Sequence, residues 1–361
     1  MSSVKEQSVA GEKQENKHVT TETTKQPIQM NKKAIWKKTF IACGISIICF
    51  FILFMFIDVS EVISSLRKIS ISIIVFSFLL YLVSYWFRAW KFKVLFDNDI
   101  AMKDLIALVC AHTMASSILP ARTGELTYFY FRKKVNKNHT FMNSLASLAV
   151  VRIFDLAALL FIFLVAFTLT AIFPSPFNLP TPIMTGLWVS SIGIAIIILL
   201  LSIFIVRGKM ATYALQKFIG FLHLSKMKPV QWLEKQGVEI ITTLDRITKK
   251  QVFILFFASL MVWVGNFIVG YLIVKDIGLL LPFSFIMIGF VATTLANALP
   301  IHGFASLGSL EGIWTLVFVA LGAPEKIAIS SGLGFHLVVI AFLIILGISG
   351  VIYLHWKKDR E

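Results

Sequence analysis

The sequence has few charged residues for its length. Asp, Glu, Lys and Arg make up 15% of the 361 residues, whereas 57% of the residues are hydrophobic. Soluble domains carry about 25% charged residues. Several apolar runs exceed the roughly 18 residues that indicate a membrane-spanning helix. The composition therefore excludes an ordinary soluble domain and predicts an all-α, polytopic integral membrane protein.

Cysteine residues are also few, and known catalytic motifs are absent from the sequence. The three cysteines, Cys43, Cys49 and Cys110, lie within apolar runs, and their spacing fits neither a disulfide framework nor a metal site. The sequence has no Walker motif, no Gly-x-Ser-x-Gly, no His-Glu-x-x-His and no Cys-x-x-Cys. We therefore expect no metal, no cofactor and no catalytic residue of these types.

Positive charge is in excess, and its distribution indicates topology rather than nucleic-acid binding. The net charge is +15. Residues 1–38 mix lysine and glutamate with Gln, Thr and Ser, a composition typical of a disordered cytoplasmic tail and not of a signal peptide. Most other Lys and Arg residues flank apolar runs, as the positive-inside rule describes. We expect no nucleic-acid partner, and we place both termini on the cytoplasmic side of the cell membrane.

The hydrophobic pattern divides residues 39–355 into a membrane domain with halves of roughly 39–180 and 181–355. Six apolar runs are long enough to be full spans: 40–57, 71–87, 144–172, 186–206, 252–274 and 327–354. Residues 58–70 are expected to form a short outer loop, and the basic stretch 88-RAWKFKVLF-96 is expected at the cytoplasmic face. The basic residues 207–250 predict a cytoplasmic loop with an interfacial helix around 210–222. Residues 356–361 form a cytoplasmic tail.

Two further apolar segments, 104–131 and 281–322, are interrupted. The breaks fall at Pro120, Gly124, Pro300, Gly303 and Gly308. A basic loop, 132-RKKVNK-137, follows the first segment, and the positive-inside rule keeps this loop in the cytoplasm only if the segment enters and returns. Irregular backbone at membrane depth needs protein or a water-filled cavity around it. We interpret both segments as re-entrant helix pairs; eight full spans are the alternative.

The two interrupted segments resemble each other in reverse. Each contains Leu-Pro at its break, and each then has a glutamate beside a glycine, at Gly124-Glu125 and at Glu311-Gly312. The first enters from the cytoplasm and the second from outside. Paired, interrupted segments in corresponding positions indicate an inverted repeat with a central site. The alternative is two proline-kinked helices without a repeat.

Ionisable residues within the predicted membrane region are costly, so they indicate either function or tight pairing. They are Arg122, Glu125, Arg152, Asp155 and Glu311. In one interpretation, Arg122 pairs with Glu125 and Arg152 with Asp155, because residues three apart are neighbours on a helix. In the other, they surround a cavity for an anionic headgroup, since guanidinium groups and helix N-termini bind phosphate.

Small polar residues of the second segment fit the same two interpretations. Ser306 and Ser309 would supply hydroxyl donors, and the nearby glycines would allow close approach to a phosphate; close helix packing is the alternative. His302 has donor capacity in the same loop, although a lone loop histidine is more often structural. His112 and His336 lie in apolar runs, and we expect them to be packed.

Taken in order, these motifs resemble the lysylphosphatidylglycerol synthase transmembrane family, also called flippase-like membrane proteins. The resemblance covers most of 40–355 and rests on 88-RAWKFKVLF-96, 119-LPARTGEL-126, 152-RIFD-155, Leu299-Pro300 and 308-GSLEG-312. It implies a lipid flippase fold in which Arg122, Glu125, Arg152, Asp155 and Glu311 line a headgroup cavity. In bifunctional members, a separate aminoacyltransferase domain makes lysylphosphatidylglycerol, and the membrane part moves this lipid outward and lowers susceptibility to cationic peptides.

The sequence contains no segment that we interpret as that transferase domain, so we expect no lysyl transfer by this chain alone. The leading hypothesis is a translocase for an anionic or aminoacylated phospholipid or a polyprenyl-phosphate lipid. The alternatives are a phosphatidylglycerol lysyltransferase-family enzyme and a non-transporting scaffold for a glycosyltransferase. The partners to consider are the lipid, a separate synthase or glycosyltransferase, and a second copy of the chain.

Overall fold

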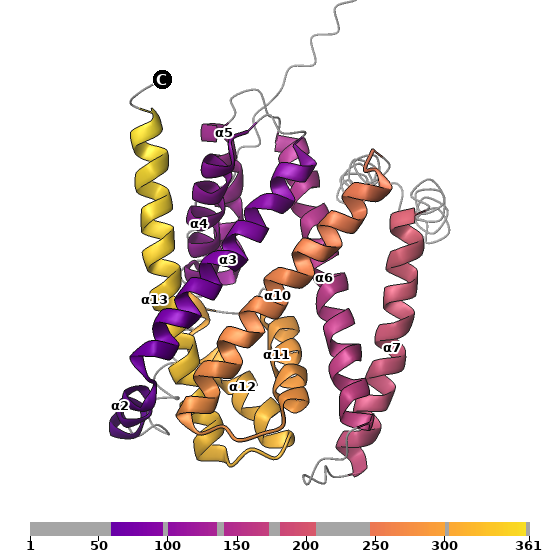
Figure 1. The fold of residues 1–361 in the computed structure, drawn as a ribbon, viewed down its shortest axis with the longest axis vertical. Coiled ribbons are helices and arrows are strands. Elements are labelled where there is room, and N and C mark those ends of the chain that lie inside the picture. Colours follow the sequence, from indigo (N-terminus) through magenta and orange to yellow (C-terminus); the bar gives the residue numbers. More distant parts are fainter. Residues whose placement is uncertain are drawn as a thin grey trace, which may run out of the picture. The chain divides into compact units, whose positions relative to one another are not determined.

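The computed structural model describes residues 59–96, 100–135, 141–172, 181–206, 246–299 and 303–358. Within these ranges every regular element is a helix (Figure 1). The expected first span at 40–57, the expected interfacial helix at 210–222, Pro300 and His302 lie outside the described residues. The described part confirms the all-α fold class.

Four of the described helices are long and apolar enough to cross a membrane. They are α3 (Ile71–Leu95), α6 (Phe141–Ile172), α10 (Lys249–Ile277) and α13 (Glu325–Lys358). A fifth helix, α7 (Thr181–Val206), is 26 residues long and contains no charged residue. At 1.5 Å per residue, 26 residues reach about 39 Å, against about 30 Å of hydrocarbon in a bilayer. These helices confirm a multi-pass membrane protein.

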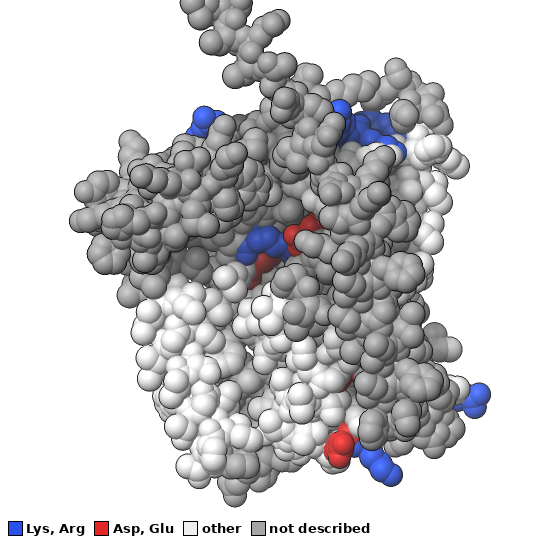
Figure 2. All heavy atoms as spheres, turned by 180° about the vertical axis from the view of Figure 1, so that it is seen from behind, with Lys and Arg blue, Asp and Glu red and all other residues white. Residues whose placement is uncertain are grey.

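The distribution of charge on one face agrees with this interpretation. Figure 2 shows blue atoms near the upper end of the face, blue and red atoms near its lower end, and one blue and red group in a recess at mid-height. The remaining described surface of that face is largely uncharged. An uncharged band between two charged ends is the surface that a bilayer requires of a spanning protein.

The interrupted segments form two broken helix pairs. The first consists of α4 (Met102–Ile118), η1 (Pro120–Leu126) and α5 (Thr127–Val135), and the second of α11 (Phe283–Asn297), η3 (Phe304–Ser306) and α12 (Ser309–Ala320). In Figure 1 the first pair lies in the upper half and the second in the lower half. At 17 residues, α4 reaches only about 25 Å. The segments therefore enter from opposite ends, as the predicted inverted repeat requires.

Two local predictions were wrong. Residues 58–70 do not form only a loop, because α2 (Val59–Lys68) lies there; apolar residues at 59, 62, 63 and 66 give it the spacing of an amphipathic helix. The span predicted for 71–87 also ends too early, since α3 continues to Leu95. The basic stretch 88–96 is therefore mainly helical, and Lys91 in it is buried with 1% exposure.

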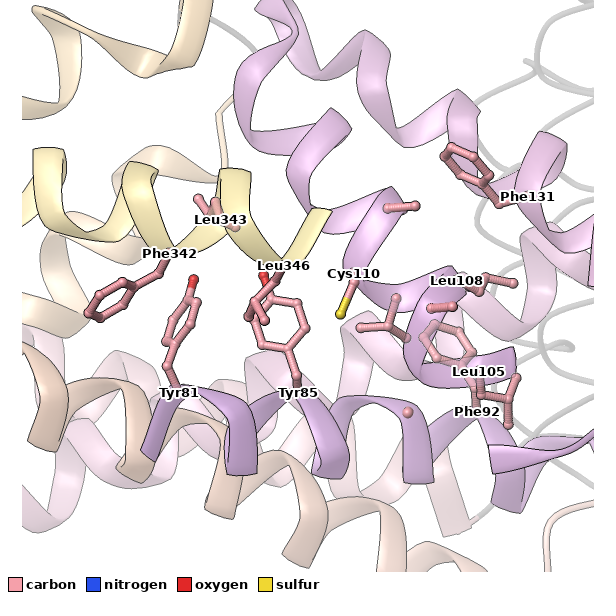
Figure 3. Close-up of a cluster of buried hydrophobic side chains, with 14 of the residues drawn as sticks. Tyr81, Tyr85, Phe92, Leu105, Leu108, Cys110, Phe131, Phe342, Leu343 and Leu346 are labelled. Carbon is pink, nitrogen blue, oxygen red and sulfur yellow. The ribbon is translucent and has the colours of Figure 1, made fainter. Parts of the chain in front are cut away.

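Buried side chains fix the first broken pair against the long helices. A first cluster of buried hydrophobic side chains includes Tyr81 and Tyr85 of α3, Cys110 of α4 and Phe342 of α13 (Figure 3). Cys110 is a buried free thiol, as predicted. A second cluster joins α6, α10, α11 and α12 around Phe290 and Trp314. The two clusters hold the two broken pairs in place.

Candidate functional site

The two breaks of the helix pairs meet inside the bundle. Pro120 begins η1 directly after α4, because a proline has no N–H to continue the α-helical hydrogen bonds. Gly124 then lies so close to α4 that an added Cβ would be 2.0 Å from the carbonyl oxygen of Ala115. A side chain at this position would therefore force η1 and α4 apart. η1 in turn contacts η3 of the second pair.

The second break contains unusual backbone. Ala305 and Ser306 have φ values of 50° and 55°, and Gly308 has a φ of 81°. Left-handed backbone at residues other than glycine costs about 1–2 kcal/mol per residue, so the surroundings must stabilise it. Ser309 Oγ donates to the Ser306 carbonyl at 3.0 Å, and Ser306 Oγ donates to Asn297 Oδ1 at 3.3 Å. Strained backbone of this kind is concentrated at functional sites.

A cavity of about 300 Å³ lies where the breaks meet. Residues from α3, α4, α6, α10, α11, α12, α13 and both breaks line it. Its polar lining residues include Arg88, Lys91, His112, Ser116, Glu125, Arg152, Asp155, Thr293, Thr294, Asn297, Ser306 and His336. Figure 2 shows blue and red atoms together in a recess of the surface at mid-height. The protein thus has a charged cavity among apolar helices.

Two ion pairs line this cavity. The Nζ atom of Lys91 pairs with the buried carboxylate of Asp155 and also donates to Ser259 Oγ at 3.2 Å. Arg152 Nη2 lies 3.2 Å from Glu125 Oε1. The first pair joins α3 to α6, and the second joins α6 to η1. Each of the two described carboxylates that line the cavity therefore already has a cation beside it.

The partners of Arg152 and Asp155 differ from the helix-neighbour pair that the spacing suggested for these two residues. Asp155 binds Lys91 of another helix, and Arg152 reaches Glu125 of the first break. Side chains three residues apart on a helix point about 60° apart, so Arg152 and Asp155 can face different neighbours. Arg122 lies in η1, and its side chain is outside the described part of the structure.

Glu311 holds the second break from behind the cavity. It is 2% exposed; its Oε2 accepts a hydrogen bond from the Gly308 N–H at 2.7 Å. Its Oε1 lies 2.5 Å from His336 Nδ1, and His336 lines the cavity. Of the residues predicted in this segment, Gly303 and Ser306 line the cavity, whereas Ser309 and Glu311 support the lining residues.

Sequence reasoning missed several lining residues. Arg88 and Lys91 were assigned to the membrane surface, because basic residues at the end of an apolar run fit the positive-inside rule. His112 and His336 are buried, as predicted, but both also line the cavity. The available signal was helical spacing: Arg88 and Lys91 are three residues apart and lie on one face of α3.

Interrupted helices that meet at a charged internal cavity define a multi-pass membrane protein with a polar site inside the bilayer region. Residues 39–347 match the lysylphosphatidylglycerol synthase transmembrane region, and the chain belongs to this family. The predicted resemblance is thereby confirmed, and the family is consistent with a membrane role related to lipids. No curated protein and no solved structure matches the chain.

Proposed function

We propose that this protein is a lipid translocase. The polar headgroup of the lipid enters the cavity while its acyl chains remain in the bilayer. The observation that carries the proposal is the pair of ion pairs, Lys91–Asp155 and Arg152–Glu125, beside a cavity at the contact of two interrupted segments. Charges at this depth are costly unless they serve a polar substrate or pathway.

The physical task of such a protein is to replace water around a headgroup. A phosphate that leaves water needs donors, and the lining residues supply cationic groups and hydroxyls. A volume of about 300 Å³ is at the lower end of the range for drug-sized ligands. This size suits a headgroup and leaves the acyl chains outside, where lipid surrounds them.

The opposite entry of the two broken pairs supports a mechanism of alternating access. In transporters with inverted repeats, one half moves against the other around a fixed central site. We propose residues 39–355 as this translocating domain, with halves of roughly 39–180 and 181–355, in the cell membrane and with both termini cytoplasmic. The substrate classes are anionic or aminoacylated phospholipids and polyprenyl-phosphate lipids. Moving such lipids would alter envelope charge and resistance to cationic peptides.

The test is a translocation assay in liposomes that contain the purified full chain. An acyl-labelled fluorescent phosphatidylglycerol is exposed to dithionite, which bleaches only the label in the outer leaflet. Wild-type protein is expected to accelerate loss of the protected half of the signal. Thr294→Trp should fill the cavity and block this effect, because Thr294 lines it. Leu316→Trp is the matched control, since Leu316 is 74% exposed on α12.

The liposome assay can contradict the translocase proposal. If wild-type liposomes and protein-free liposomes bleach at the same rate for phosphatidylglycerol, lysylphosphatidylglycerol and a polyprenyl phosphate, the translocase proposal is wrong. Equal rates for wild type and Thr294→Trp would show that lipid moves without using this cavity. Retained partner binding by a transport-inactive protein would instead favour the scaffold hypothesis.

A further inference from the structure

Arg88 is a lining cation that forms no direct ion pair within the described residues; the carboxylate of Asp155 acts on it through space but is paired with Lys91. Arg88 lies on α3 and lines the cavity. The lining carboxylates Asp155 and Glu125 pair with Lys91 and Arg152. In the part of the chain that the structure describes, Arg88 makes neither an ion pair nor a hydrogen bond, and its buried Nε has no acceptor. Among the described lining residues, three Lys and Arg side chains (Arg88, Lys91 and Arg152) therefore face two carboxylates (Glu125 and Asp155).

Two aromatic rings hold the Arg88 guanidinium. Its central carbon lies 5.7 Å from the ring centroid of Tyr85 and 5.8 Å from that of Trp263. Contacts of this kind are favourable and restrict the side chain without using its N–H donors. Trp263 also lines the cavity, and its indole Nε1 is buried without a hydrogen-bond partner among the described residues.

The Arg88 Nε–H and the Trp263 Nε1–H are two neighbouring buried donors without acceptors among the described residues, which indicates that a ligand supplies the acceptor. Buried N–H groups are nearly always paired, because a buried donor without a partner is costly. A guanidinium group offers a planar fork of donors that matches the oxygens of a phosphate. An anion beside Arg88 would accept hydrogen bonds from the guanidinium group and from the Trp263 N–H, and it would neutralise the positive charge of Arg88.

We propose that Arg88 and the Trp263 N–H bind the phosphate of a lipid headgroup, and that the cavity selects headgroups of net negative charge. This selection rests on the proposed translocase function. A lysylated headgroup adds ammonium groups, and the lining carboxylates that would receive them are already paired. Unpaired charge in a desolvated site is disfavoured. The substrate class is therefore an anionic phospholipid or lipid phosphate rather than its aminoacylated form.

The experiment measures equilibrium binding to the purified full chain in a nonionic detergent at low salt. The probes are dihexanoyl phosphatidylglycerol, its lysyl ester and inorganic phosphate. We expect Arg88→Gln to weaken phosphatidylglycerol binding about tenfold or more, as loss of a charge-assisted contact predicts. Arg67→Gln is the control, because it removes the same charge from an exposed position on α2 and should leave binding unchanged.

Two further comparisons test selection and folding. Wild type should bind the lysyl ester at least about tenfold more weakly than phosphatidylglycerol, and Arg88→Gln should narrow this difference. Arg88→Lys keeps the charge but loses the planar fork, so its affinity should fall between those of wild type and Arg88→Gln. Thermal unfolding of each variant shows whether weaker binding reflects an unfolded protein.

The outcomes that overturn the proposal are distinct from those that overturn translocation. Equal or tighter binding of the lysyl ester removes the selection for anionic headgroups, and unchanged binding by folded Arg88→Gln removes Arg88 from the site. Inorganic phosphate that binds as tightly as phosphatidylglycerol assigns the site to free phosphate and overturns the lipid assignment. Arg88-dependent lipid binding by a protein that translocates nothing would refute the proposed function and leave the phosphate contact in place.

Discussion

Lys91 and Asp155 form a buried ion pair between α3 and α6. Their side chains are 1% and 7% exposed, and the Lys91 Nζ also donates to Ser259 of α10. One ammonium group thus connects three of the long helices beside the cavity. Because each charge depends on the other inside the bundle, this pair differs from an ion pair at a surface.

Removing one member of this pair should strongly destabilise the protein. We expect Lys91→Met to lower the free energy of unfolding by about 3–5 kcal/mol, because it leaves the carboxylate of Asp155 buried without its cation. The double variant Lys91→Met/Asp155→Leu should lose less than either single variant. Denaturant unfolding of the purified protein in micelles measures all three.

Lys103→Met is the control for this series. Lys103 is exposed near the start of α4, so the same substitution there should change stability by no more than about 0.5 kcal/mol. If Lys91→Met is as mild as Lys103→Met, the pair contributes little and the coupling of α3 to α6 must come from apolar packing.

The helices and their interruptions could be predicted because local chemistry determines them. The length of an apolar run sets a span, and Pro120 and Gly124 interrupt a helix through their own backbone properties. The end of α3 was missed because its last turns are basic. Those turns stay helical inside the bundle because the Lys91 ammonium group pairs with the carboxylate of Asp155, a residue 64 positions away in the sequence.

The partners of the charged side chains in the cavity could not be predicted, because they too are distant in the sequence. Arg152 and Asp155 are close in sequence, yet they face η1 and α3, and only the packing of α6 determines which neighbour each meets. The position of Glu311 behind the second break likewise depends on His336 of α13. Sequence spacing identified costly charges, whereas the tertiary fold assigned their contacts.

Gly124 offers a test of the first break. We expect Gly124→Ala to destabilise the protein by about 1–3 kcal/mol, as overpacking typically does, because its Cβ would overlap the backbone of α4 at Ala115. Gly312→Ala is the matched control, since nothing lies within 4 Å of a Cβ there. In α12 this change should be neutral or stabilise by up to about 1 kcal/mol. Thermal unfolding compares the two; equal effects would contradict the close approach of η1 to α4.

Glu311 should control the order of the second break. Glu311→Ala removes the acceptor of the Gly308 N–H and the partner of His336, so the strained backbone at 305–306 loses support. We expect amide hydrogen exchange in a peptide covering 303–310 to accelerate about tenfold or more, the factor that corresponds to roughly 1.4 kcal/mol. Glu325→Ala, at an exposed position on α13, should leave this peptide unchanged. Unchanged exchange in Glu311→Ala would assign the support of the break to other contacts.

Substitution of Arg152 should lower the transport rate more than it lowers the stability of the fold. The side chains of Arg152 and Glu125 are 42% and 30% exposed, and ion pairs with such exposure contribute about 0–1 kcal/mol. We therefore expect Arg152→Gln to unfold nearly as wild type does, while its rate in the liposome assay falls about tenfold through the loss of a charged contact to the headgroup. The exchanged pair Arg152→Glu/Glu125→Arg keeps both charges and should recover part of the rate. A loss of stability as large as that of Lys91→Met, or an undiminished transport rate, would show that Arg152 serves the bundle rather than the substrate.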